Sequence, residues 1–176
     1  MNEKTDMFHR IESAFDILHF TQNLIQFADN KANTLIVINS IFLASLPSLA
    51  AERTFMVVGG GFLGILRGLF FVASVTAVIY CLLVVMARKD NPETSKRPDL
   101  IFFDDIVKHK NASSYFYEYM KIGDATLLED LARRNFNAAG IAQNKYNLYG
   151  TALRVTFASC LLWIACILTP YMTIIR

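Results

Sequence analysis

Three long uncharged runs divide the chain into polar and apolar parts. Residues 32–51, 68–87 and 155–175 contain no charged side chain, and these runs are 20, 20 and 21 residues long. An α-helix needs about 20 apolar residues to cross the ~30 Å hydrocarbon core of a bilayer. Three such runs in a chain of 176 residues predict an all-α integral membrane protein with three transmembrane helices.

The segment before the first run has the pattern of an amphipathic helix. Its apolar residues recur at steps of three and four, and no Gly or Pro interrupts the chain between Met7 and Leu46. The apolar face contains Phe8, Ile11, Phe15, Leu18 and Ile25, widened by Ile17, Phe20, Leu24 and Phe27. We therefore expect residues 1–31 to form a cytosolic stalk helix that continues without a break into the first span, 32–51.

The segment before the third run repeats this arrangement. A helical pattern extends from Leu128 through Ala142 into the span at 155–175, with Gly140 and Gly150 as the flexible points. This predicts a second stalk that continues into the third span.

The remaining segments connect these helices. Residues 52–67 are expected to form the outer turn and the start of the second helix, whose span is 68–87. The cytosolic segment, 88–154, begins with a loop rich in proline and charge. Residues 100–110 and 112–122 then predict a short helical hairpin, which precedes the second stalk.

The distribution of charge predicts the orientation in the membrane. All but three of the 17 lysines and arginines lie in residues 1–31 or 88–154, the exceptions being Arg53, Arg67 and Arg176. Because positive charge is enriched in cytoplasmic segments, the N-terminus and residues 88–154 are expected in the cytoplasm and the C-terminus in the periplasm. The net charge of +2 does not favour binding to nucleic acid.

Glycines recur every fourth residue at the start of the second helix. Gly60, Gly64 and Gly68 form a ridge of small residues of the kind that lets helices approach closely in lipid, and Arg67 lies beside it. In one interpretation Arg67 extends to the headgroups and the glycines contact the first span. In the other, this face lies at the axis of a homo-oligomer or pore, because a charge inside a membrane is costly.

The chain offers little that predicts catalysis. Asp104, Asp105 and His109 are the closest approach to a metal or hydrolase cluster, but a third ligand at a useful spacing is missing. An exposed ion pair between Asp105 and His109 is the simpler interpretation. The three cysteines lie inside the spans, where they predict apolar packing, and the chain has no phosphate-binding glycine loop or nucleophile elbow. We do not expect an enzyme or a bound cofactor, and a metal measurement would test the alternative.

A ligand-binding cleft between the cytosolic helices fits the sequence better. Basic and amide side chains suited to phosphate, together with aromatic faces suited to a base, lie on the stalks and the hairpin. The candidate residues are Asp29, Lys31, Phe102, Phe103, Arg133, Arg134, Asn144 and Lys145. The alternative is that Phe102 and Phe103 form the core of the hairpin and the two arginines a solvated face.

Three stretches, in order along the chain, are similar to one known family. They are Ala28-Asp29-Asn30-Lys31-Ala32 with Leu35 and Asn39; Leu100 to Ile106 with Tyr115 to Met120; and Asp130-Leu131-Ala132 with Ile141, Asn144-Lys145-Tyr146 and Leu148. This set resembles the Pycsar transmembrane effectors of bacterial antiphage defence. The resemblance implies a companion cyclase that makes a cyclic pyrimidine mononucleotide, cyclic UMP or cyclic CMP, and an effector that then compromises the inner membrane.

The combined expectation is a nucleotide-responsive inner-membrane effector that acts as a homo-oligomer. The alternative is a non-enzymatic membrane scaffold that binds a protein partner through the apolar face of residues 8–27.

Overall fold

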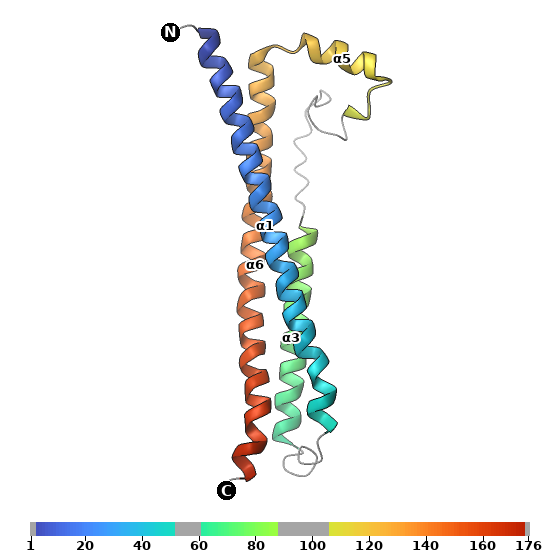
Figure 1. Cartoon of the computed structure of the whole chain (residues 1–176), viewed down its shortest axis with the longest axis vertical. Coiled ribbons are helices and arrows are strands. Elements are labelled where there is room, and N and C mark those ends of the chain that lie inside the picture. Colours follow the sequence, from blue (N-terminus) through green and yellow to red (C-terminus); the bar gives the residue numbers. More distant parts are fainter. Residues whose placement is uncertain (1–2, 52–60, 88–105, 175–176) are drawn as a thin grey trace. The chain divides into compact units, whose positions relative to one another are not determined.

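The fold was taken from a computed structural model that describes residues 3–51, 61–87 and 106–174. These residues form four α-helices and no strand (Figure 1). The helices are α1 (Glu3–Ala51), α3 (Phe62–Met86), α5 (Ala112–Lys121) and α6 (Asp124–Ile174). The predicted all-α class is confirmed.

Two of these helices are long and apolar enough to cross a membrane. They are α3 over its whole length and α6 over Asp124–Thr169. The first predicted span, residues 32–51, belongs to α1. The total of three spans stays a prediction.

Both stalk segments share a helix with the apolar run that follows them. Helix α1 has 49 residues and includes Pro47, and α6 has 51 residues and passes through Gly140 and Gly150 without a break. Each of the two long helices therefore joins a polar half to an apolar half, as the sequence pattern predicted.

Only one arm of the predicted hairpin is a helix in the described residues. Helix α5 matches the second arm, and its N-cap residue Asn111 forms a capping box with Ser114. The Asn111 side chain accepts a hydrogen bond from the Ser114 amide at 2.8 Å, which satisfies a free N–H group of the first turn. The prediction for 100–110 is wrong from Val107 onward, where the chain forms turns and bends, and residues 100–105 lie outside the described residues.

The chain divides into two compact units. The polar unit comprises residues 1–24 and 88–142, and the apolar unit comprises residues 25–87 and 143–176. Each long helix contributes its first part to the polar unit and its second part to the apolar unit.

Within the apolar unit, α1 and α6 run parallel and α3 runs antiparallel to them. Along α1, Asp29, Asn39 and Ser45 contact successive residues of α6 in the same order, at Lys145, Thr156 and Trp163. The contacts of α3 with α6 run in the opposite order, from Ser74–Ser159 to Val84–Lys145. The core of this unit contains Ala32, Leu35, Cys81, Val84 and Ala152.

The buried positions of the long helices follow a heptad pattern. In α3, Leu63, Phe70, Ala77 and Val84 recur every seventh residue, and Ser74 and Cys81 alternate with them. Steps of three, four and seven also relate the buried residues of α1 (Ala14, Thr21, Ala28, Ala32, Leu35 and Asn39) and those of α6 from Ala142 onward (Ala142, Lys145, Ala152, Thr156, Ser159 and Cys166), whereas Leu131 precedes Ala142 by eleven residues. A repeat of 3.5 residues per turn is the signature of left-handed coiled-coil packing.

This pattern corrects the predicted apolar face of the first stalk. Phe8, Phe20 and Phe27, which the sequence placed on the packed face, are each at least half exposed, whereas Ala14, Thr21 and Ala28 are buried. Small side chains let two helix backbones approach closely, and a neighbouring phenylalanine is then displaced to the surface. The isoleucines and leucines at 11, 18, 24 and 25 are half-buried beside these small residues, so the packed stripe is narrower than the predicted face.

The glycine ridge at the start of α3 is open. Gly64 and Gly68 are exposed, and a Cβ atom added to either would meet nothing within 4 Å. The interpretation in which these glycines contact the first span is therefore wrong for the two residues that the structure describes. Gly60 lies outside the described residues. Arg67 differs from the glycines because it is half-buried and its Nε atom is covered.

Candidate ligand-binding site

The strongest polar cluster lies in the apolar unit and is centred on Lys145 of α6. The Lys145 side chain is 3% exposed, and its Nζ atom forms an ion pair with the Asp29 carboxylate of α1. The same ammonium donates hydrogen bonds to the carbonyl oxygens of Val84 at 2.8 Å and Val85 at 3.2 Å, in the last turn of α3. The Val84 carbonyl also accepts from the Ala87 N–H at the C-cap, at 3.3 Å, so Lys145 adds a charged partner to the last turn of α3 while Asp29 neutralises the charge.

This arrangement, the Lys145 clasp, ties three helices together at one level. An ammonium group has three hydrogen-bond donors, and all three are used within the clasp. Lys145 can bind a phosphate only if it releases one of these partners. The contacts of Lys145 and Asp29 therefore give this pair a structural role that does not depend on a ligand.

Two other predicted residues lie in the same unit but outside the clasp. The Nζ atom of Lys31 lies 4.3 Å from the centre of the Phe27 ring and 5.6 Å from that of Tyr149, within the range of cation–π attraction. Asn144 is exposed on α6.

The remaining predicted residues belong to the polar unit. Arg133 of α6 pairs with Asp130 at 3.1 Å and with Glu129 at 3.8 Å, so its charge is balanced on its own helix. Arg134 is half-buried. Phe102 and Phe103 lie outside the described residues. Of the eight predicted ligand residues, the structure brings Asp29 and Lys145 into contact, and a shared ligand role for the set stays a prediction.

Further polar contacts cross the apolar unit below the clasp. The Asn39 amide donates to the Thr156 hydroxyl at 2.9 Å and to the Leu35 carbonyl at 2.8 Å. Ser74 and Ser159 share a hydrogen bond, and all four of these polar side chains are buried. The Trp163 indole donates to Ser45 at 2.9 Å. These bonds at buried heptad positions fix the register of the three helices, since a polar group at such a position tolerates few alternative partners.

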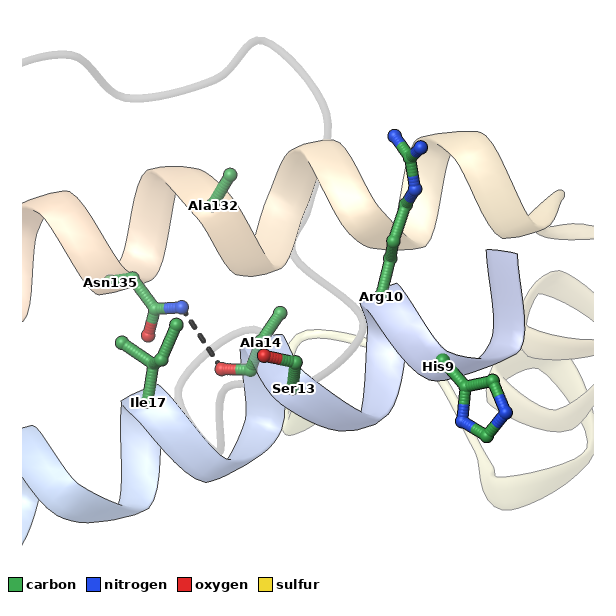
Figure 2. Close-up of a pocket in the computed structure, with 7 residues that line it drawn as sticks. All are labelled: His9, Arg10, Ser13, Ala14, Ile17, Ala132 and Asn135. Carbon is green, nitrogen blue, oxygen red and sulfur yellow. Dashed lines mark hydrogen bonds between the residues drawn. The ribbon is translucent and has the colours of Figure 1, made fainter. Parts of the chain in front are cut away.

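A groove lies in the polar unit, between α1 and α6 (Figure 2). Its volume is about 500 Å³, and it is lined by His9, Arg10, Ser13, Ala14, Ile17, Ala132 and Asn135. The Asn135 amide donates to the Ala14 carbonyl across the groove at 2.9 Å. The Asn135 Oδ1 atom is buried without a hydrogen-bond partner among the described residues.

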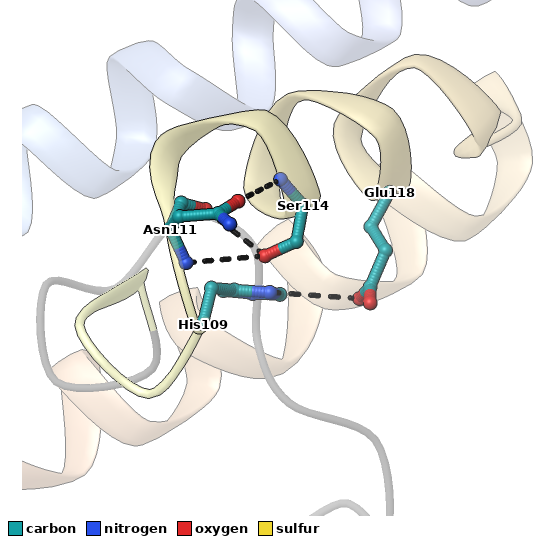
Figure 3. A network of polar contacts seen from close by, with 4 residues as sticks. All are labelled: His109, Asn111, Ser114 and Glu118. Carbon is teal, nitrogen blue, oxygen red and sulfur yellow. Dashed lines mark hydrogen bonds and ion pairs between the residues drawn. The ribbon is translucent and has the colours of Figure 1, made fainter.

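A second, smaller cavity adjoins the start of α5. It has a volume of about 290 Å³ and is lined by Lys108, His109, Lys110, Ser114 and Glu118. Figure 3 shows His109 directed at the Glu118 carboxylate, 3.8 Å away, beside the Asn111–Ser114 capping box. The His109 ring also meets the edge of Tyr115, with the ring centres 5.4 Å apart.

These contacts change the interpretation of the possible metal cluster. His109 lies in the turn before α5 rather than on a helix, and its partner Glu118 was not among the predicted residues. Asp104 and Asp105 lie outside the described residues. Across the described part of the chain, no group of three His, Cys, Asp or Glu side chains could hold a metal ion.

Comparison with known proteins identifies the family. A family model described as the Pycsar effector protein domain (PycTM) matches residues 13–170. The chain belongs to the Pycsar effector family. No curated protein and no solved structure matches it.

Membership in the Pycsar effector family confirms the resemblance seen in the sequence. The family places the chain among antiphage effectors that respond to a cyclic-nucleotide signal from a cyclase, and these effectors are generally non-catalytic membrane proteins. The apolar helices α3 and α6 agree with a membrane protein.

The groove is the feature that sequence reasoning missed. Asn135 follows Arg134, a predicted ligand residue, and Arg10 lies on the predicted first stalk. Neither Asn135 nor Arg10 belongs to a recognisable sequence motif. Only the pairing of α1 with α6 brings them to one cavity. A helical-wheel comparison of the two stalks could have found the small residues Ala14 and Ala132, but not which of them face each other.

Proposed function

We propose that this Pycsar effector senses a cyclic pyrimidine mononucleotide directly and, in response, breaks the permeability barrier of the bacterial inner membrane. The observation that carries the proposal is the family match over residues 13–170, joined to the two apolar helices within that range. The ligand is cyclic UMP or cyclic CMP, made by a companion cyclase.

The proposed membrane topology has three spans, at 32–51, 68–87 and 155–175. The N-terminus and residues 88–154 face the cytoplasm, and the C-terminus faces the periplasm. The distribution of lysine and arginine supports this orientation. The nucleotide is then on the same side as the polar unit.

The signal is proposed to travel along α1 and α6. Each of these helices enters both units, so a change in how the two helices pack in the polar unit is proposed to be passed along the continuous helices to their apolar halves. A ligand drives such a change only through a higher affinity for one of the two packings.

The active form is proposed to be a homo-oligomer. The exposed Gly64 and Gly68 ridge on α3 supports this, because it leaves space for close approach of another apolar helix. Cysteine cross-linking at Ile65, which is exposed beside this ridge, should trap a dimer or higher species in membranes. Replacing Gly64 and Gly68 by leucine should abolish the cross-link, and a cross-link that persists would contradict this interface.

Dye release from proteoliposomes tests the proposed function. Purified full-length protein in vesicles of bacterial phospholipid should release a trapped dye on addition of cyclic UMP or cyclic CMP, and not on addition of cyclic AMP. Protease accessibility establishes how many copies expose the polar unit to the added nucleotide. The proposal is wrong if neither pyrimidine nucleotide releases dye at a saturating concentration from vesicles in which the polar unit faces outward.

One observation favours a second candidate, a membrane scaffold for a protein partner. Phe8, Phe20 and Phe136 of the polar unit are at least 64% exposed and offer apolar contacts for a partner protein. Capture of one stoichiometric protein from lysate, lost in a Phe8/Phe20/Phe136 triple serine variant and combined with no effect of nucleotide on the melting temperature, would favour the scaffold.

A further inference from the structure

We infer that the groove between α1 and α6 in the polar unit is the nucleotide-binding site of this effector, with Arg10 as the phosphate ligand and Asn135 as the group that contacts the pyrimidine. The inference rests on the proposed function and names the residues that would carry its first step. Neither residue was among the candidates that the sequence suggested.

The groove is open to solvent. It has a volume of about 500 Å³, and most of the residues that line it are exposed, so a ligand would lie along its surface rather than be enclosed. Ala14, Ile17 and Ala132 give it apolar walls from both helices. The two small alanines leave the space that a flat pyrimidine ring requires.

Arg10 supplies the charge that a cyclic phosphate needs. Its guanidinium forms an exposed ion pair with Asp6 at 2.9 Å, one turn before it on α1. A guanidinium has five N–H donors, so it can bind a monoanionic phosphate while keeping or exchanging this weak surface contact. In Figure 2 the Arg10 side chain extends from α1 toward α6, whereas His9 turns away at the end of the groove.

Asn135 supplies the group that can recognise a base. Its Nδ2 atom is held by the Ala14 carbonyl, while its Oδ1 atom is buried and lacks a hydrogen-bond partner among the described residues. A buried acceptor without a partner costs about 1–3 kcal/mol, which a donor from a bound ligand would recover. A ligand reaches Oδ1 only if the amide rotates, and this rotation moves Nδ2 away from the Ala14 carbonyl.

The chemistry of the amide suits either pyrimidine. It offers one acceptor and one remaining donor, which complements the amino group and N3 of cytosine as well as N3–H and O4 of uracil. Ser13 adds a hydroxyl at the same cavity. The groove is therefore expected to bind both cyclic CMP and cyclic UMP.

The position of Asn135 also connects binding to helix packing. Its bond to the Ala14 carbonyl is a direct polar contact between α1 and α6 in the polar unit. A ligand that takes over the Asn135 amide weakens this contact and separates the two helices locally. The packing of α1 against α6 then differs between the free and the nucleotide-bound protein, as a nucleotide signal requires.

Direct binding to the full-length protein in lipid nanodiscs tests the inference. Calorimetry with cyclic CMP and cyclic UMP should show that R10A and N135A each raise the Kd by about tenfold or more, the loss expected for one charge-assisted or buried hydrogen bond. Lys121→Ala and Asn23→Ala remove an exposed cation and an exposed amide that do not line the groove, and they should bind as wild type.

A space-filling pair separates loss of a contact from loss of the cavity. Ala132→Phe should block the groove and abolish binding, whereas Ala139→Phe adds the same ring at an exposed position of α6 that does not line it. The salt dependence of binding tests the role of Arg10 independently. The Kd of wild type should rise with ionic strength, and that of R10A should rise less, because salt screens the attraction between the guanidinium and the phosphate.

The outcomes distinguish the two proposals. If wild-type protein neither binds nor responds to either nucleotide, the proposed function fails. If wild type binds and responds while R10A, N135A and Ala132→Phe bind equally well, the groove is not the site. Equal loss of binding in Ala139→Phe and Ala132→Phe would also overturn the inference, because the effect would then not depend on the groove.

Discussion

The helix interfaces of the two units differ in how closely they are packed. In the apolar unit, Lys145, Thr156, Ser159 and Trp163 of α6 each find a partner on α1 or α3, although Asn39 Oδ1 is buried without a partner among the described residues. In the polar unit, the interface between α1 and α6 opens into a groove of about 500 Å³, where Asn135 Oδ1 is likewise buried without such a partner.

The difference follows from the solvent that each unit is expected to meet. Lipid offers no hydrogen bonds, so polar groups in a membrane must be satisfied within the protein. Water can hydrate an open groove, and a ligand can replace that water. An open interface that a ligand can change therefore costs less free energy in the polar unit. In the apolar unit, the helices need an interface whose polar contacts hold them in one register.

The largest expected effect comes from breaking the Lys145 clasp. Asp29→Ala leaves a buried ammonium without its counter-ion and should destabilise the protein by about 3–5 kcal/mol, measured as a fall in the free energy of unfolding in detergent. Lys145→Met should cost less, because the Asp29 carboxylate that it leaves behind is 29% exposed.

Lys31→Ala is the control for the clasp, because Lys31 is half-buried outside the clasp and its cation–π contacts are worth about 1–2 kcal/mol, less than the loss expected for Asp29→Ala. Unchanged stability in Asp29→Ala and Lys145→Met, together with loss of nucleotide binding, would contradict the structural role. It would instead support the phosphate role that the sequence suggested for Lys145.

An intermediate effect is expected from overfilling the buried serine pair. Ser159→Leu places a large side chain where Ser159 meets Ser74, both fully buried, and should cost about 1–3 kcal/mol through strain. Ala158→Leu, at the neighbouring exposed position, is the matched control and should leave the melting temperature in detergent unchanged. A melting temperature for Ser159→Leu equal to that of the control would show that α3 and α6 are not closely packed at this level.

The smallest effect on stability is expected from the exposed aromatics of the polar unit. Phe20→Ala and Phe136→Ala should each change the free energy of unfolding by about 0.5 kcal/mol or less, because these side chains are 64% and 73% exposed. A loss of several kcal/mol in either variant would mean that another molecule covers this surface, either a second copy of the chain or a partner protein. Sedimentation of the variant and wild type would distinguish these two cases.

Local pattern alone predicted the helices and their continuity. The absence of glycine and proline from Met7 to Leu46, and the charge-free runs, are properties of neighbouring residues, and the structure agrees with them in α1, α3 and α6. The ordered motifs also led to the correct family. The helix predicted for 100–110 failed from Val107, where turns and bends lead into the N-cap of α5 at Asn111, because the apolar pattern of so short a segment does not define where a helix ends.

Tertiary structure decided which faces meet and which side chains form sites. The sequence favoured a wide apolar face for the first stalk. Its isoleucines and leucines at 11, 18, 24 and 25 are half-buried, its phenylalanines are exposed, and the buried positions are Ala14, Thr21 and Ala28. The pairing of α1 with α6 assigned Lys145 to Asp29 and placed Asn135 beside Ala14. These contacts join residues more than a hundred positions apart, and the periodicity of a single helix carries no information about its partner's register.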